Sequence, residues 1–335
     1  MKHFNFTNKK SKYLLLAIIS FLIIVSAIFI NNFSNQTVSK SGFYFNTYIN
    51  ISIYDKPKKD GELLIDKCFD ICNEYENLYS KTIPTSDIYK INHSNKKPVN
   101  VDNKTIDIIK KSIDYAKVSN GEIDPSIGTL TSLWNILDDD FILPSDDDIK
   151  TALSTVNYNN IIINDQNNTI TLSDENSMID LGFIAKGYIA DKLKEFLINN
   201  NVQSAIINLG GNILCIGTKP DKSDFTIGIN DPKNPYSNSL TSIKINDLSV
   251  VSSGNYERFK DINGTRYHHI ISLKNGYPAS SDLSQVTIIS SSSTDGDFLS
   301  TLCYILGHDK AITFLENNYP DVTAIFVDSD GNIIN

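Results

Sequence analysis

The stretch "SAIINLGGNILCIG" (Ser204 to Gly217) decides the fold class that this sequence predicts. Two runs rich in apolar residues flank Gly210-Gly211, which predicts a strand, a tight turn and a second strand. Further short strands are expected near residues 225–230, 240–245, 248–253, 267–272 and 284–290. Because the predicted strands and helices are clustered along the chain and do not alternate strictly, the sequence predicts an α+β fold rather than a doubly wound parallel sheet.

The N-terminal 30 residues read as a membrane segment. Residues 1–12 ("MKHFNFTNKKSK") are basic, and Tyr13–Ile30 contains 18 residues without a charge, which is just long enough to span a bilayer. Lysines before this segment predict a cytoplasmic N-terminus, with the rest of the chain outside the cell membrane. We therefore expect a transmembrane signal-anchor at 13–30. A cleaved signal peptide, with small residues at Val25–Ala27, is the alternative.

A single globular domain is expected after this segment. Residues 31–42 read as a polar linker, and the domain covers residues 43–335. It opens with "FYFNTYINISIYD" (Phe43–Asp55), whose alternation and aromatic content predict one strand. Its four cysteines contain no CxxC pair and three lie in apolar helical patterns, so we expect buried thiols.

Charge excludes one class of partner. The chain has a formal charge of -9, and the four lysines near its start leave -13 on residues 31–335. A body this acidic, with no basic stripe, repels polyphosphate backbones, so nucleic-acid binding is not expected. An anionic small ligand would need a cation or backbone amides to hold it.

Two segments carry candidate ligands for such an anion. In "MIDLGFIAKGYIAD" (Met178 to Asp191), Asp180 ends a strand, and Lys186 falls in the first turns of a helix predicted over 182–199. A helix N-terminus beside a lysine suits an anion. In "STDGDFLSTL" (Ser293 to Leu302), a helix starting near Asp297 places Asp297 and Thr301 on one face. These two side chains could contribute to a Mg²⁺ site, or the acids could simply cap the helix.

Two further segments are weaker signals alone. Asp124 precedes Pro125 in "NGEIDPSIGTLTSLWNI" (Asn120 to Ile136), which is typical of a capped turn. His268 and His269 are neighbours in a predicted strand, so one could face a pocket while the other faces away.

Taken in order, these segments resemble the ApbE family of FAD:protein FMN transferases. The matching motifs are "GEIDPSIGTL", "IDLGFIAKGY", "LGG", "SSGNYERF", "HHIISLKNGYP" and "DFLST", and "LYSKTIPTSDIYKIN" also fits. The resemblance covers residues 43–330. It implies an ApbE, T-fold-like mixed domain that takes FAD, attaches FMN to a Thr side chain of another protein through a phosphodiester, and releases AMP. An exported or membrane redox protein is the expected acceptor.

The resemblance also implies a role for individual residues. His269 would be the catalytic base. Mg²⁺, with Mn²⁺ as the alternative, would be held by Asp297, Thr301 and the backbone carbonyl of Phe183. Contacts with FAD would come from Phe45, Asp124, Asp180, Lys186 and Ile271.

The sequence departs from the family pattern in two places. Phe45 stands where the family usually has Met, and Ser272-Leu273 replace a common Asp-Pro. The acceptor motif of the family's targets is not present in "DGDFLST", so this chain is expected to modify other proteins. Two alternatives remain: a Mg²⁺-dependent hydrolase that splits FAD into FMN and AMP, and a non-catalytic flavin-binding surface protein.

Overall fold

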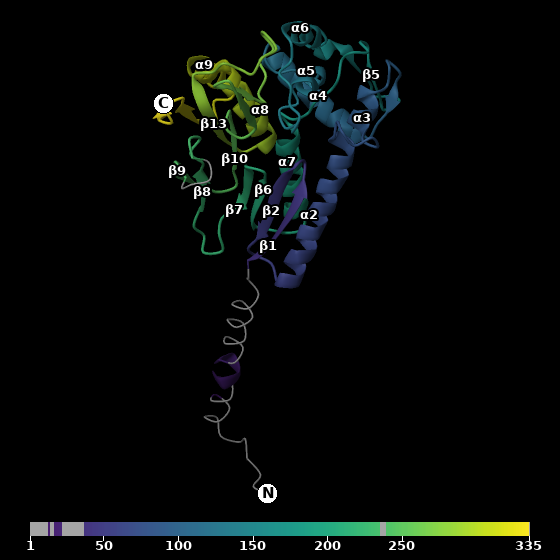
Figure 1. Ribbon diagram of the computed structural model, residues 1–335. Helices are drawn as coiled ribbons and strands as arrows, with labels where there is room; N and C mark the ends of the chain where they lie inside the picture. Colours follow the sequence, from purple (N-terminus) through teal and green to yellow (C-terminus); the bar gives the residue numbers. More distant parts are fainter. Residues whose placement is uncertain (1–12, 14–16, 22–36, 235–238, 335) are drawn as a thin grey trace.

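The computed structural model describes residues 13, 17–21, 37–234 and 239–334. Its framework is an eight-stranded antiparallel sheet in the order β1-β2-β6-β7-β10-β13-β14-β15 (Figure 1). The strands of this sheet are β1 (Val38–Tyr44), β2 (Thr47–Ile53), β6 (Ser204–Leu209), β7 (Asn212–Gly217), β10 (Ser249–Gly254), β13 (Leu283–Ser290), β14 (Thr323–Asp328) and β15 (Ile333–Ile334). The predicted α+β class is confirmed.

The stretch at Ser204–Gly217 forms the hairpin that the sequence predicts. Strands β6 and β7 pair in antiparallel register, with Leu209 opposite Asn212, and only Gly210 and Gly211 lie between them. Both glycines have positive φ, 63° and 93°, as a two-residue hairpin turn requires. Strand β2 then pairs with the other side of β6, which joins the N-terminal hairpin to one end of the sheet, with β1 as an edge strand.

Three helices pack on one face of the sheet: α2 (Lys58–Tyr79), α7 (Ala185–Asn199) and α8 (Ser293–Leu306). Their apolar faces and the inward side chains of the sheet form the main core, which includes Ile51, Leu193 and Phe298. Strand β13 is buried along nearly its whole length. Its polar side chains are buried as well, and Gln285 donates a hydrogen bond to Thr287 Oγ1 at 3.0 Å.

Smaller elements surround this framework. The opposite face of the sheet carries the hairpin of β8 (Phe225–Ile229) and β9 (Thr241–Ile245), whose Phe225 and Ile227 pack on Cys215 and Val250. The remaining elements are α3 (Asp87–Asn92), β3 (Val99–Asn100), α4 (Asn103–Val118), α5 (Gly128–Trp134), α6 (Asp146–Ser154), η1 (Tyr158–Asn160), β4 (Ile161–Asn164), β5 (Thr169–Leu172), β11 (Phe259–Ile262), β12 (Thr265–His268) and α9 (His308–Asn318).

The start of the domain differs from the prediction. Phe43–Asp55 is not one strand, because the chain turns at Phe45-Asn46 and β1 pairs with β2. The predicted linker 31–42 is also too long, since β1 begins at Val38. Val38 is 5% exposed because it pairs opposite Ile53 and packs against Gly61 of α2. Contacts with residues distant in the sequence therefore hold the polar residues after Val38 in strand β1, although their composition predicted a linker.

The membrane prediction falls mostly outside the described residues. Residues 1–12, most of Tyr13–Ile30 and residues 31–36 of the predicted linker are among those not described. In the part of the chain that the structure describes, no helix is both long and apolar enough to cross a bilayer.

Candidate functional site

Helix α8 begins four residues earlier than the sequence predicted. It starts at Ser293, because the Ser292 side chain caps it by accepting a hydrogen bond from the Asp295 amide at 3.1 Å. The Asp295 carboxylate instead accepts a hydrogen bond from the Tyr115 hydroxyl. Asp297 therefore lies in the second turn of α8 and is not its capping residue.

Asp297 reaches across to the start of α7. Its carboxylate is buried and accepts a hydrogen bond from the Gly187 amide at 2.9 Å, and Lys186 Nζ lies 3.5 Å from its other oxygen. The N-cap residue of α7, Ile184, has no side chain able to cap the helix. A carboxylate of α8 thus satisfies an N-terminal amide of α7, where the helix dipole favours negative charge.

This contact leaves the Phe183 carbonyl without its usual partner. In a regular helix the Gly187 amide would donate to the carbonyl four residues back, yet it donates to Asp297. Among the described residues, none donates a hydrogen bond to the Phe183 carbonyl oxygen. Thr301 Oγ1 donates to the Asp297 carbonyl at 3.2 Å and lies 3.3 Å from Ser253 Oγ, so a donation from Ser253 still leaves one lone pair of Thr301 available.

The predicted metal ligands are therefore chemically suitable for Mg²⁺. They offer a carboxylate, a hydroxyl and an unpaired backbone carbonyl, which are the oxygen donors that Mg²⁺ prefers. The described residues contain no group of three or more His, Cys, Asp or Glu side chains that could hold a metal. The site consequently depends on the hydroxyl and the carbonyl, with water or a phosphate needed to complete an octahedral shell.

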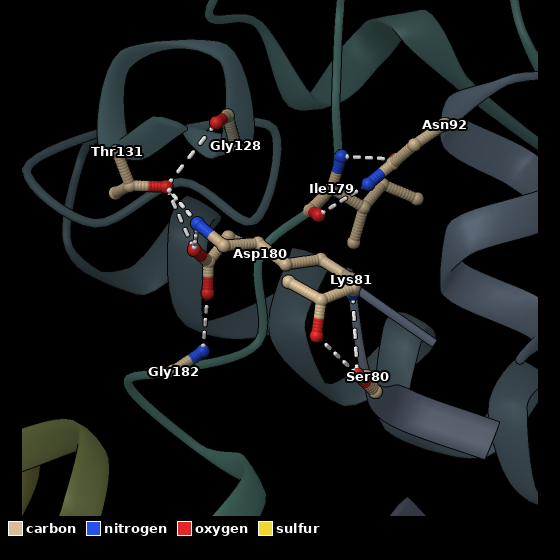
Figure 2. A network of polar contacts seen from close by, with 9 residues as sticks. Ser80, Lys81, Asn92, Gly128, Thr131, Ile179, Asp180 and Gly182 are labelled. Carbon is tan, nitrogen blue, oxygen red and sulfur yellow. Dashed lines mark hydrogen bonds and ion pairs between the residues drawn. The ribbon is translucent and has the colours of Figure 1, made fainter. Parts of the chain in front are cut away.

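Asp180 is the centre of a polar network that Figure 2 shows. Its carboxylate accepts hydrogen bonds from Lys81 Nζ at 2.8 Å, Thr131 Oγ1 at 2.7 Å and the Gly182 amide at 2.8 Å. Burial alone would raise the pKa of Asp180, but Lys81 and these hydrogen bonds outweigh it and hold the pKa below its ordinary value. Asp180 is thus kept ionised and fixes the loop that leads into α7.

The Asp124 segment lies beside the Asp180 segment. Gly128 donates its amide to the Met178 carbonyl at 2.8 Å, and a Cβ at Gly128 would lie only 2.5 Å from that oxygen. The Asp124 carboxylate itself is occupied by Ser126 and by the Tyr158 amide. Burial raises its pKa, which these hydrogen bonds partly offset. Within the described residues, Asp124 anchors its own turn.

The two neighbouring histidines differ in their contacts. His268 is buried, with Nε2 3.2 Å from the Ala279 carbonyl and Nδ1 accepting from the Ile270 amide at 3.3 Å. His269 is half-buried, and its Nδ1 is buried with no hydrogen-bond partner among the described residues. Of these two histidines, only His269 therefore has a ring nitrogen without a partner among the described residues.

Burial and nearby charge keep His269 neutral. Desolvation lowers its pKa most, and the positive charges of Arg258 and Lys186 add to the effect, so that the pKa falls to about 3. The electrostatic effect of Lys186 links His269 to the group formed by Lys186 and Asp297. A neutral imidazole at physiological pH can accept a proton.

The last two predicted FAD contacts are Phe45 and Ile271. Phe45 adopts φ of 54°, uncommon for a bulky residue, and its amide donates to Glu76 at 2.7 Å. Its turn adjoins the Gly210 turn, where a Cβ would lie 2.3 Å from Thr47 Oγ1. Ile271 is buried in a separate small core with Leu130 and Trp134.

Sequence reasoning missed four residues of this region. Lys81 and Thr131 hold Asp180, and the signal for Lys81 was present in the matched segment "LYSKTIPTSD". Glu257 and Arg258 belong to "SSGNYERF". The Glu257 side chain is exposed, yet the protein surrounding its carboxyl raises its pKa, against the opposing charges of Lys186 and Arg258.

The antiparallel α+β fold carries a neutral imidazole with an unpaired ring nitrogen and an oxygen-rich helix junction, which are groups that an enzyme site commonly contains. Comparison with known proteins identifies which family has this combination. The ApbE family model matches residues 45–326, and the chain belongs to that family.

Relatives and solved structures cover nearly the whole chain. The FAD:protein FMN transferase of Klebsiella pneumoniae is 33% identical over 301 residues, which is 90% of this chain and 92% of that protein. The protein of the same name from Treponema pallidum is 30% identical over 310 residues, covering 88% and 85%. The ApbE protein of Thermotoga maritima superposes with a TM-score of 0.82 at 29% identity, covering 89% of this chain and 96% of that one.

Proposed function

We propose that this protein transfers FMN from FAD to a Thr hydroxyl of another protein, forming a phosphodiester and releasing AMP. The observation that supports this most is the geometry at the start of α7. There, Asp297, an unpaired Phe183 carbonyl and Lys186 lie together, and the positive charge of Lys186 helps to keep His269 neutral. The chain belongs to a family whose curated members are named FAD:protein FMN transferase.

Magnesium is part of this proposal. Asp297, Thr301 and the Phe183 carbonyl would hold the ion. When bound, it would offset the charge of the FAD pyrophosphate and stabilise charge on the transferring phosphoryl group. Because residues 31–335 carry a charge of -13, a cation at this position would reduce the repulsion between the protein and the anionic FAD. Lys186 supplies a second positive charge 3.5 Å from Asp297.

His269 acts on the acceptor. Its neutral ring takes the proton of the Thr hydroxyl while that oxygen attacks the phosphorus of the FMN moiety. The new bond joins the Thr oxygen to phosphorus, and the bond that breaks joins the same phosphorus to the oxygen of the departing AMP. The low pKa of His269 keeps the imidazole unprotonated before the attack.

FAD is oriented by the residues around these groups. Asp180, fixed by Lys81 and Thr131, presents the loop that leads to the α7 N-terminus. Phe45 contributes an apolar surface from the neighbouring turn. Asp124 and Ile271 lie in segments that support the Asp180 loop and the His269 loop. Their contribution to FAD binding is therefore indirect in this proposal.

The acceptor is a redox protein outside the cytoplasm. This part of the proposal rests on the basic residues 1–12 and the uncharged Tyr13–Ile30, which would anchor the chain in the cell membrane with its domain outside. The intact mass of the native protein tests whether this segment is retained. A mass that lacks the first 27 residues would support a cleaved signal instead.

One incubation tests the activity. The purified protein is mixed with FAD, Mg²⁺ and a domain that carries a family acceptor motif, and the acceptor is weighed. A gain of one FMN is expected. Free FMN and AMP with an unmodified acceptor would overturn transfer and favour the hydrolase, and FAD binding without turnover would favour the non-catalytic binder.

The His269→Ala variant tests the assignment of the base. It should bind FAD as tightly as the wild type, because His269 is not among the proposed FAD contacts, and should transfer FMN at least about 100-fold more slowly. Isothermal titration gives the affinity and mass spectrometry gives the rate. Transfer at the wild-type rate would show that another group takes the proton. His268→Gln is the matched control, since His268 makes its own contacts away from Lys186.

A further inference from the structure

Helices α7 and α8 cap one another through two carboxylates. Asp297 of α8 accepts the Gly187 amide at the start of α7. In the opposite direction, Asp191 of α7 lies at the start of α8. No role has been assigned to Asp191 so far, and its contacts are the most complete of any acidic side chain outside the proposed ligands.

Asp191 satisfies the first two amides of α8. Its Oδ1 accepts a hydrogen bond from the Ser293 amide at 2.9 Å, and its Oδ2 accepts from the Thr294 amide at 2.9 Å and from the Thr294 hydroxyl. Ser292 Oγ lies 3.3 Å from the same carboxylate and caps the third amide. Asp191 therefore does across two helices what an N-cap residue does within one.

The two helices touch between these carboxylates. A Cβ at Gly187 would lie 2.2 Å from the Ser293 carbonyl oxygen and 2.8 Å from Asp297 Cβ. Asp191 is one turn beyond Gly187 on α7, and Asp297 is one turn beyond Ser293 on α8. The reciprocal caps thus fix how far each helix can slide along the other.

We infer that Asp191 is a positioning residue for the metal site, acting through α8. It holds the first turn of α8 against α7. In this position Asp297 and Thr301 can bind the same metal ion as the Phe183 carbonyl, which lies just before the N-terminus of α7. This inference rests on the proposed function, because it assigns these three groups as metal ligands. Asp191 contacts no proposed ligand itself, since all its partners lie at residues 292–294.

Removal of Asp191 should displace ligands rather than delete them. In Asp191→Ala, the amides of Ser293 and Thr294 lose their acceptor, and the start of α8 is free to move. In Asp191→Asn, one oxygen can still accept, while the new NH₂ group faces an amide that also donates. The alanine variant should therefore perturb the site more than the asparagine variant.

Direct binding of Mn²⁺ by the full-length chain tests the inference. Mn²⁺ prefers similar oxygen ligands and is visible by electron paramagnetic resonance. Its dissociation constant, measured with FAD present, should rise at least about tenfold in Asp191→Ala, as expected when a supporting partner of a ligand is lost. A smaller rise is expected in Asp191→Asn. An unchanged constant in both variants would overturn the inference.

A matched control lies on the same helix. Glu195 is one turn further along α7, also carries one negative charge, and pairs on the surface with Lys192 at 3.0 Å. Glu195→Gln should leave Mn²⁺ binding unchanged. If it weakens binding as much as Asp191→Ala does, the effect is one of net charge and the inference is wrong.

A purely structural role predicts a different result. Excess Mn²⁺ should restore the transfer rate of the Asp191 variants, because their ligands are present but displaced. A structural defect would instead reduce the active fraction at every metal concentration. If Asp191→Ala does not fold, Thr294→Val removes one partner of Asp191 and repeats the measurement. A wild-type protein that binds Mn²⁺ but transfers no FMN would contradict the proposed function and leave the Mn²⁺ comparison valid.

Discussion

At the scale of single residues, electrostatics separates two adjacent histidines. His268 and His269 are both neutral in the folded protein, with pKa values lowered to about 4 and about 3, in each case mainly by burial. They differ in their partners, because His268 bonds to the backbone on both ring nitrogens while Nδ1 of His269 is unpaired. The sequence predicted that they would face different ways, but only the structure shows which one remains available.

Replacement of His268 should change the acid sensitivity of the fold. A histidine in the unfolded chain titrates near 6.5, so between that pH and about 4 the unfolded state binds the proton that folded His268 excludes. The free energy of unfolding therefore falls as the pH drops through this window, by about 1.4 kcal/mol per pH unit for each such histidine. In His268→Gln the loss between pH 6.5 and 5 should be smaller by about 2 kcal/mol.

Urea unfolding at both pH values measures this difference. The glutamine amide can still donate to the Ala279 carbonyl, so stability at pH 7 should change little compared with the pH effect. The carboxylates titrate alike in both proteins, so their contributions to the pH dependence cancel when the two proteins are compared. Equal losses in the two proteins would mean that His268 is not excluded from protonation in the fold.

At the scale of secondary structure, the sequence predicted elements better than their ends. The hairpin predicted at Ser204–Gly217 agrees with the structure, because its glycine pair is a clear turn signal. The predicted start of α8 was wrong by four residues, because the helix begins at Ser293 and not at Asp297. Ser292 caps that helix together with Asp191, which is about one hundred residues away in the sequence, and no local pattern records such a contact.

The contact between α7 and α8 should tolerate no side chain at Gly187. In Gly187→Ala the new methyl group would lie 2.2 Å from a backbone carbonyl, so the helices must move apart. Overpacking of this kind costs about 1–3 kcal/mol in the free energy of unfolding. Chemical denaturation measures the cost.

Gly61→Ala provides the comparison. Gly61 is also a buried helical glycine, but its new methyl group would meet only the Val38 side chain, at 2.8 Å. That neighbour can shift, and alanine is favoured over glycine within a helix by roughly 0.5–1 kcal/mol. The Gly61 variant should therefore lose clearly less stability than the Gly187 variant. The reverse order would contradict the packing described for α7 and α8.

At the scale of the whole molecule, the family and the α+β class were predictable. Six ordered motifs identify the family, and the clustering of predicted strands and helices along the chain indicates the class. Which motif residues act together was only partly predictable. The pairing of Asp297 with Gly187 and of Asp180 with Lys81 depends on packing between segments roughly one hundred residues apart. Asp124 shows the limit most clearly, since one of its carboxylate oxygens accepts from its own turn and the other from the distant Tyr158 amide.

The four cysteines should remain thiols even on the oxidising side of a membrane. Cys68, Cys72, Cys215 and Cys303 are buried and free, and burial raises the pKa of the last three to about 12. Thiolate is the reactive form, so alkylation should be slow in the native protein. Iodoacetamide followed by intact-mass measurement should add no label to the native protein and four labels in denaturant. Rapid native labelling would contradict the buried environment.

The antiparallel order of the sheet also has a consequence for how the chain is made. Strand β2 pairs with β6 at Ile49 and Leu209, so 160 residues must be synthesised before the inner edge of the N-terminal hairpin meets its partner. At about 5–20 residues per second this takes roughly 8–30 s. During that time β2 offers unpaired backbone groups and the apolar side chains of Ile49, Ile51 and Ile53 to other chains. The nascent chain therefore depends on protection of this edge until β6 emerges.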